Sequence, residues 1–125
     1  MSVSTKHPTD KNKYEPYVYK VVKVVRVYDG DTITVVLDLG FSTYTKKILR
    51  IANINAPEIR GEERSAGLAA RNRLRSILEN AENIFVTTYK DHTGKYGRYI
   101  ADVYADDINV GQQLVKEGLA DEHIY

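Results

Sequence analysis

Hydrophobic and polar positions divide the chain into strand-like and helix-like stretches. Residues 17–28 are almost all β-branched, aromatic or basic, which predicts a strand. From Thr32 to Leu39 apolar side chains alternate with mostly polar ones, as in a half-buried strand. The Asp29-Gly30-Asp31 segment between the two runs predicts a tight hairpin turn. The core-facing residues of the second strand would be Ile33, Val35, Leu37 and Leu39.

A third strand is predicted from Thr43 to about Ile54, ending before Pro57, which has no backbone N–H to donate. By the strand period of two, Arg50 shares a face with Ile48, Ala52 and Ile54, which predicts an inward-facing guanidinium among apolar neighbours. Such a group stays charged and needs an anion. The partner is either a carboxylate in a structural ion pair or a phosphate bound in a cleft.

One long helical pattern follows a loop at residues 58–64, and further strands and a short helix complete the fold. Strands are predicted at 84–89 and 99–104, joined by a turn at 91–94, and a helix at about 110–117 ends at Gly118. This order predicts an α+β, mainly β fold: a five-stranded OB-type β-barrel with an inserted helix and a short C-terminal helix. The apolar stripe of the inserted helix contains Ala66, Ala70, Leu74, Ile77, Leu78 and Ala81.

Domain organisation and composition are those of one globular domain. Residues 1–16 have no apolar periodicity and are expected to form a flexible leader, so the domain would span residues 17–125. The chain is 42% hydrophobic and 28% charged. The absence of cysteine excludes thiol catalysis, zinc–thiolate sites and disulfides. Without a long apolar run or an apolar signal-peptide segment, we expect no membrane contact and a cytoplasmic location.

The net charge of +1 is unevenly distributed along the chain. Residues 1–28 carry six Lys or Arg and two Asp or Glu, whereas residues 99–125 carry one and six. A basic N-terminal segment of this kind is typical of proteins with an anionic partner, most often nucleic acid. An ordinary mixed surface would give the same counts.

Three segments carry side chains with possible chemical roles. The acids of Asp29-Gly30-Asp31 either only build the turn or direct an Asp31 oxygen toward a hard metal ion. Asn55-Ala56-Pro57-Glu58 places two oxygen-bearing side chains at a strand end, or is a plain strand stop. Lys95-Tyr96-Gly97-Arg98 combines two cations, a phenol and a glycine, or is a solvated hairpin. The histidines at 7, 92 and 123 are all expected to be solvated.

Taken in order, these segments resemble the motifs of the staphylococcal-nuclease-like (thermonuclease) family, over about residues 17–121. The residues that carry the resemblance are Asp29-Gly30-Asp31-Thr32, Leu49-Arg50-Ile51, Ala56-Pro57-Glu58, Lys95-Tyr96-Gly97-Arg98 and Gly118-Leu119-Ala120. The resemblance implies an OB barrel and a calcium-dependent phosphodiesterase that acts on DNA and RNA. The compact, arginine-rich sequence also looks like that of a phage- or plasmid-encoded protein.

The resemblance implies a calcium site and indicates which residues would be its ligands. Asp31 looks like the carboxylate ligand, and the backbone carbonyl of Ala56 looks like another. Asn55 falls where the family usually has a second aspartate, so this chain has an amide in place of a charge. Calcium accepts carboxylate, amide and backbone carbonyl oxygens. The resemblance therefore predicts a calcium site with one negative charge fewer than usual.

The catalytic roles also follow from the resemblance. Glu58 looks like the general base that acts on the attacking water, and Arg50 and Arg98 look like the pair that grips the scissile phosphate. Lys95 and Tyr96 resemble supporting phosphate contacts. Independently of the family, phosphodiester cleavage needs an activated water, a cation and donors that stabilise developing negative charge.

The resemblance therefore implies a calcium-dependent nuclease of DNA and RNA, which we expect to be monomeric and to prefer single strands. The alternative is an OB-fold nucleic-acid-binding module without full catalytic activity, which would use the same arginines and strand aromatics as a basic, stacking groove. Glu58 favours the enzyme, because a binding module has no use for a carboxylate aimed at a phosphate.

Overall fold

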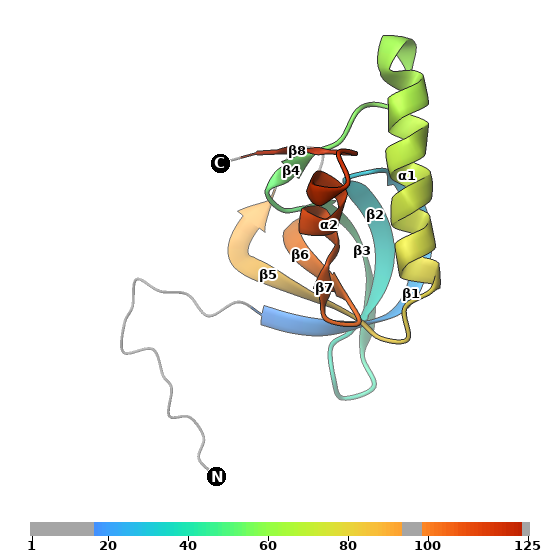
Figure 1. Ribbon diagram of the computed structural model, residues 1–125. Coiled ribbons are helices and arrows are strands. Elements are labelled where there is room, and N and C mark those ends of the chain that lie inside the picture. The colour runs from blue at the N-terminus through green and yellow to red at the C-terminus, as the bar shows by residue number, and fades with distance from the viewer. Residues whose placement is uncertain (1–16, 94–98, 124–125) are drawn as a thin grey trace.

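A computed structural model describes residues 17–93 and 99–123, and a closed five-stranded barrel forms its centre (Figure 1). The sheet order is β3-β2-β1-β5-β6, and parallel pairing of β3 with β6 closes the barrel. The remaining neighbours in the barrel pair antiparallel. The predicted OB-type barrel is confirmed. Its strands are β1 (Tyr17–Asp29), β2 (Thr32–Asp38), β3 (Tyr44–Ile51), β5 (Ile84–Thr93) and β6 (Tyr99–Ala105).

Two helices and three very short strands cover the barrel. Helix α1 (Arg64–Glu79) follows a single 3-10 turn, η1 (Gly61–Glu63), and packs along β1 (Figure 1). Helix α2 (Val110–Lys116) packs against β6, which also pairs with β7 (Ile108–Asn109). At one end of the barrel β4 (Ile54–Asn55) pairs with β8 (Asp121–Glu122). Both predicted helices are therefore present, with the short one ending just before Gly118 at φ 77°.

The core confirms most of the predicted apolar faces. From β2, Ile33, Val35 and Leu37 are buried, whereas Leu39 lies beyond the end of the strand and is exposed. The buried positions of α1 are Gly67, Ala70, Leu74 and Leu78. Ala66, predicted on this stripe, is exposed, and its neighbour Gly67 is buried instead, against the backbone of Glu58 and Ile59.

The prediction for the third strand is wrong in both length and face. β3 ends at Ile51, because Asn53 turns the chain with φ 66° before β4 begins. Leu49 and Ile51 point inward at 1% exposure, whereas Ile48 is 43% exposed. Arg50 therefore lies on the outer face of the barrel. Apolar residues occur at both odd and even positions of this strand, so the sequence alone does not show which set faces inward. The register with β2, which pairs Leu49 with Ile33, places the odd-numbered set inside the barrel.

The turn predicted at residues 91–94 is also partly wrong. Strand β5 continues to Thr93, so positions 91–93 belong to a strand. Residue 94, the leader at 1–16 and the Lys95-Tyr96-Gly97-Arg98 segment lie outside the described residues. Across residues 17–93 and 99–123, no helix has the length and apolarity needed to cross a membrane.

Two glycines allow the segments around the candidate site to pack against each other. A Cβ on Gly30 would lie 2.7 Å from the Cβ of Ala56 and 2.8 Å from that of Ala70. A Cβ on Gly67 would lie 2.1 Å from the carbonyl oxygen of Glu58. Gly30 has no positive φ, so the hairpin turn needs it for this close approach and not for backbone conformation. The contacts fix the hairpin turn and the Glu58 segment against α1.

We expect Gly67→Ala to destabilise the protein by about 1–3 kcal/mol, because the Glu58 segment must move to make room for the methyl group. In an unconstrained helix the same change would stabilise by about 1 kcal/mol. Urea unfolding measures the difference, with Ser65→Ala on the exposed part of α1 as the control. A Gly67→Ala protein as stable as the parent would show that the close contact has no energetic consequence.

Candidate active site

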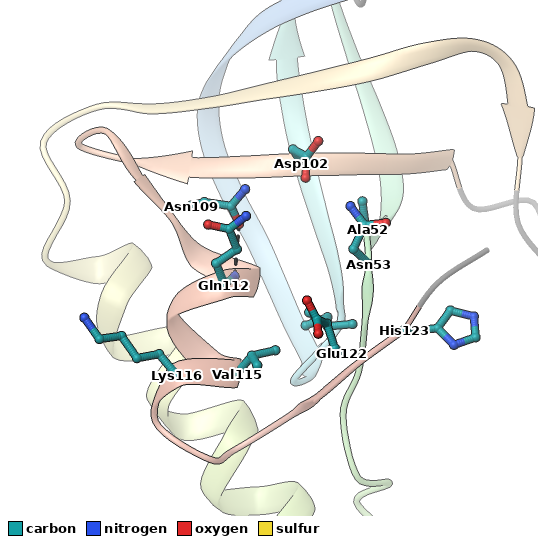
Figure 2. Close-up of a pocket in the computed structure, with 10 residues that line it drawn as sticks. Ala52, Asn53, Asp102, Asn109, Gln112, Val115, Lys116, Glu122 and His123 are labelled. Atoms are coloured by element: carbon teal, nitrogen blue, oxygen red, sulfur yellow. Dashed lines mark hydrogen bonds between the residues drawn. The ribbon is translucent and has the colours of Figure 1, made fainter.

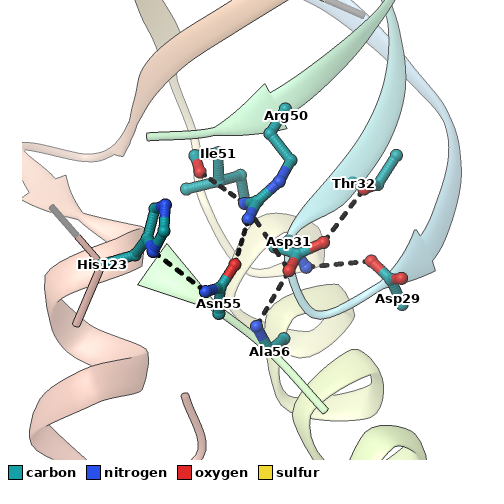
Figure 3. Close-up of polar contacts among 8 residues, drawn as sticks. All are labelled: Asp29, Asp31, Thr32, Arg50, Ile51, Asn55, Ala56 and His123. Carbon is teal, nitrogen blue, oxygen red and sulfur yellow. Dashed lines mark hydrogen bonds and ion pairs between the residues drawn. The ribbon is translucent and has the colours of Figure 1, made fainter. Parts of the chain in front are cut away.

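Asp31 is the most enclosed acidic group of the site. It is 7% exposed and lies in the turn between β1 and β2. Its Oδ2 accepts a hydrogen bond from the backbone N–H of Ala56 at 2.8 Å, and its Oδ1 accepts one from the Thr32 hydroxyl at 3.0 Å (Figure 3). Arg50 Nη1 lies 3.5 Å from the same Oδ2. The carboxylate thereby joins the hairpin turn to β3 and to the segment after β4.

Arg50 connects two of the predicted metal ligands. Its Nη2 donates to Asn55 Oδ1, and its Nη1 donates to the carbonyl of Ile51 at 3.0 Å in addition to pairing with Asp31. Figure 3 shows the guanidinium between the Asp31 carboxylate and the Asn55 amide. Oxygens from two separate segments thus face one positive group. The structure brings Asp31, Arg50, Asn55 and Ala56 together.

His123 also belongs to this cluster, although the sequence predicts a solvated side chain. Its Nδ1 lies 3.1 Å from Asn55 Nδ2, and its backbone N–H donates to the carbonyl of Asn53 at 2.8 Å. The prediction is wrong because the pairing of β8 with β4 brings together residues far apart in the chain. Each of these strands has two residues, too few for a recognisable alternation, so no local sequence signal could have found the contact.

The oxygens of Asp31 and Asn55 suit a hard cation. They already face a cationic group, and carboxylate and amide oxygens are ligands that calcium accepts. Among residues 17–93 and 99–123 no cluster of three His, Cys, Asp or Glu side chains could hold a metal ion. The Asp31 and Asn55 oxygens are therefore of the kind that calcium binds, but together they carry a single negative charge, that of the Asp31 carboxylate.

Asp29 accepts a hydrogen bond from the backbone N–H of Asp31 at 3.1 Å. Burial, a side-chain hydrogen bond with Asp31 and the negative charge of Asp31 raise the pKa of Asp29 from 3.8 to about 6, and the backbone hydrogen bond from Asp31 only partly opposes this shift. The folded protein therefore binds a proton at Asp29 more readily than the unfolded chain does.

Glu58 lies in a groove with a volume of about 570 Å³, here called the Glu58 groove, which also reaches Thr32. Two guanidinium groups line it and are held by one tyrosine. Arg60 donates to the Tyr28 hydroxyl at 3.0 Å, and the Arg26 guanidinium lies 5.1 Å from the centre of the Tyr28 ring. Tyr28 contributes a hydroxyl and a ring, not a carboxylate, so these contacts position both guanidinium groups without an ion pair, while the carboxyl groups of Asp29 and Glu58 line the same groove. The groove thus offers an exposed carboxylate and two positioned cations.

A second pocket, with a volume of about 380 Å³, lies between α2, β6 and β8 (Figure 2). Glu122 and Asp102 line it, and the His123 ring lies at its edge, away from Glu122. This placement agrees with the alternation of successive side chains, which turns the ring of His123 toward Asn55. The remaining predicted site residues, Arg98, Lys95 and Tyr96, lie outside the described part of the chain.

Comparison with known proteins identifies the family. Residues 48–125 match the model of the staphylococcal nuclease homologue family, so the chain belongs to that family. It is also 33% identical over 99 residues to a protein named "Uncharacterized endonuclease" from Escherichia coli O157:H7, and to the same degree to one of that name from Escherichia coli. The matches cover 78% of this chain and 58% of each relative, so the chain spans little more than half the length of the curated relatives it matches.

Replacing Asp29 with Asn should stabilise the protein at pH 7.5 and have little effect at pH 4. The carboxyl has a raised pKa in the folded state, so its contribution to stability falls as the pH rises from about 4 through about 6. An amide keeps the acceptor for Asp31 N–H and carries no charge. Thermal unfolding in chelator-containing buffers across this range measures the effect. A variant whose gain in stability does not depend on pH would contradict the cause given for the shift.

Proposed function

We propose that this chain is a calcium-dependent nuclease that hydrolyses phosphodiester bonds in DNA and RNA and prefers single-stranded substrates. The observation that carries the proposal is the convergence of Asp31 and Asn55 oxygens on the Arg50 guanidinium, close to the Glu58 groove. Membership of the staphylococcal nuclease homologue family and the endonuclease names of the relatives support the same reaction.

In the proposed reaction, the oxygen of a water molecule attacks phosphorus, and the bond to the leaving oxygen breaks as that oxygen takes up a proton from solvent. Glu58 takes the proton from the attacking water, a role open to an exposed carboxylate in a groove large enough for substrate. Asp31, Asn55 and the backbone carbonyl of Ala56 would hold calcium, which when bound neutralises charge on the non-bridging phosphate oxygens.

Arg50 would bind the scissile phosphate. Its planar guanidinium can donate two hydrogen bonds to phosphate oxygens, and these strengthen as negative charge develops. In the free protein it faces the oxygens of Asp31 and Asn55, which keeps it at the site before substrate arrives. By resemblance, Arg98 would be the second arginine on the phosphate, and Lys95 and Tyr96 would add supporting contacts.

The Glu58 groove is the proposed path of the polynucleotide beside the scissile bond. Arg26 and Arg60 would contact backbone phosphates, because Tyr28 positions both guanidinium groups without neutralising them. The alternative function, binding nucleic acid without catalysis, is favoured by one observation: the predicted ligand set contains one carboxylate, since position 55 is Asn. The two functions differ in whether the bound strand is cut.

Cleavage of single-stranded DNA and RNA in calcium, compared with a chelator, tests the proposed function, and Glu58→Gln tests its mechanism. We expect the variant to bind nucleic acid normally and to lose about 10²–10⁴-fold in rate, because an amide cannot accept the proton of the water at neutral pH. Binding is measured in calcium on strands with non-hydrolysable linkages. Absent cleavage by the parent would refute the nuclease, cleavage that persists in chelator would refute its calcium dependence, and unchanged cleavage by Glu58→Gln would remove Glu58 from the mechanism.

For the groove, Arg26→Gln and Arg60→Gln should each weaken binding of single-stranded DNA and reduce its salt dependence. Each lost phosphate contact on a single strand lowers the slope of log affinity against log salt by about 0.7. Arg71→Gln, which removes the same charge from helix α1, is the matched control and should leave the slope nearly unchanged. Equal slopes in all three variants would place the polynucleotide elsewhere.

A further inference from the structure

The Asn55 side chain is held at both ends by partners of different chemistry. Its Oδ1 accepts from Arg50 Nη2, and its Nδ2 lies 3.1 Å from His123 Nδ1 (Figure 3). A guanidinium has donors and no acceptor, so the amide oxygen must face Arg50. The amide NH₂ then faces His123, and Nδ1 of the imidazole must be the acceptor. The network thus fixes the orientation of the amide.

Orientation matters for an amide in a way that it does not for a carboxylate. Both ends of an aspartate side chain are oxygens, so either end can face a cation. An asparagine rotated by half a turn presents NH₂, which cannot be a ligand for a hard cation. Asn55 therefore needs a partner that specifies its rotamer, especially once Arg50 engages a phosphate and releases the amide oxygen.

His123 is well placed to be that partner, because backbone contacts fix its position. Asn55 pairs with Asp121 in the β4–β8 ladder, and the His123 N–H donates to the carbonyl of Asn53 at 2.8 Å. The imidazole contact comes from a segment that follows the turn at Gly118, remote in sequence from Asn55. The contact does not involve Arg50 and would persist when Arg50 moves.

We propose that His123 is a positioning residue that selects the amide orientation in which Asn55 Oδ1 is presented to a cation. This inference rests on the proposed function, in which Asn55 is a calcium ligand. It assigns to His123 a role that a chain with aspartate at position 55 would not require, so His123 compensates for the amide. If His123 has this role, replacing it changes the affinity for calcium and not only the rate of turnover.

The test is a calcium titration by calorimetry of His123 variants in two backgrounds. With Asn55 present, His123→Leu should weaken calcium binding roughly 3- to 10-fold, the range for one lost hydrogen bond. His123→Asn should stay within about 2-fold of the parent, because its Oδ1 lies the same number of bonds from Cβ as Nδ1 and accepts the same N–H. Thermal unfolding checks that all variants are folded.

Asn55→Asp supplies the second background, in which the orientation requirement disappears. We expect Asn55→Asp alone to tighten calcium binding about 10-fold or more, since added ligand charge raises affinity. Adding His123→Leu to Asn55→Asp should then change calcium affinity by less than about 2-fold. An equal loss in both backgrounds would show a merely structural role for His123 and overturn the proposal, as would an unchanged affinity of His123→Leu with Asn55 present.

A second readout separates this inference from the proposed function. In ¹⁵N NMR spectra without calcium, the Asn55 side-chain NH₂ should show slowed hydrogen exchange in the parent and in His123→Asn, and fast exchange in His123→Leu. If the parent binds no calcium, the proposed calcium site fails, and with it the role of His123 toward calcium. Fast exchange in the parent would show that His123 does not fix the amide at all.

Discussion

The buried charge of Asp31 is the constraint around which the site is built. A carboxylate that is almost fully enclosed must be satisfied by donors. Here the adjacent Thr32 hydroxyl is one donor, and the Ala56 N–H and the Arg50 guanidinium come from two other segments. Satisfying one charge therefore fixes the hairpin turn, β3 and the end of β4 relative to each other. The close approach permitted at Gly30 is part of the same requirement, since any side chain there would push Ala56 away.

Much of the fold could be predicted from the sequence because its signals are local. The alternation at Ile33, Val35 and Leu37 and the helical stripe at Ala70, Leu74 and Leu78 each define a buried face within a few residues. The face of β3 could not be predicted, because apolar residues occur in both phases and only pairing with β2 selects one. The break at Asn53 could not be predicted for a related reason: the residue with positive φ leads directly into a second short strand of apolar and polar residues.

The residues of the site also differ in whether the sequence could predict their positions. The resemblance of their motifs assigns Asp31, Arg50 and Asn55 to one site, and the structure places the three side chains in contact, while the roles assigned to them stay predictions. His123 could not be predicted, because it reaches Asn55 through strands of two residues each. The amide at position 55 and the imidazole that contacts it form one arrangement: an amide has two unlike ends, and the contact with a second side chain orients them.

The central claim is that the oxygens of Asp31 and Asn55 form one cation-binding pair, held by the Arg50 guanidinium until substrate and metal arrive. The most direct measurement is a crystal structure of the protein with calcium and a nucleotide bisphosphate. The account predicts calcium bound to Asp31 and Asn55 oxygens, with the Arg50 guanidinium turned to a phosphate. A structure in which Arg50 still bridges Asp31 and Asn55 while calcium and phosphate bind elsewhere would contradict it.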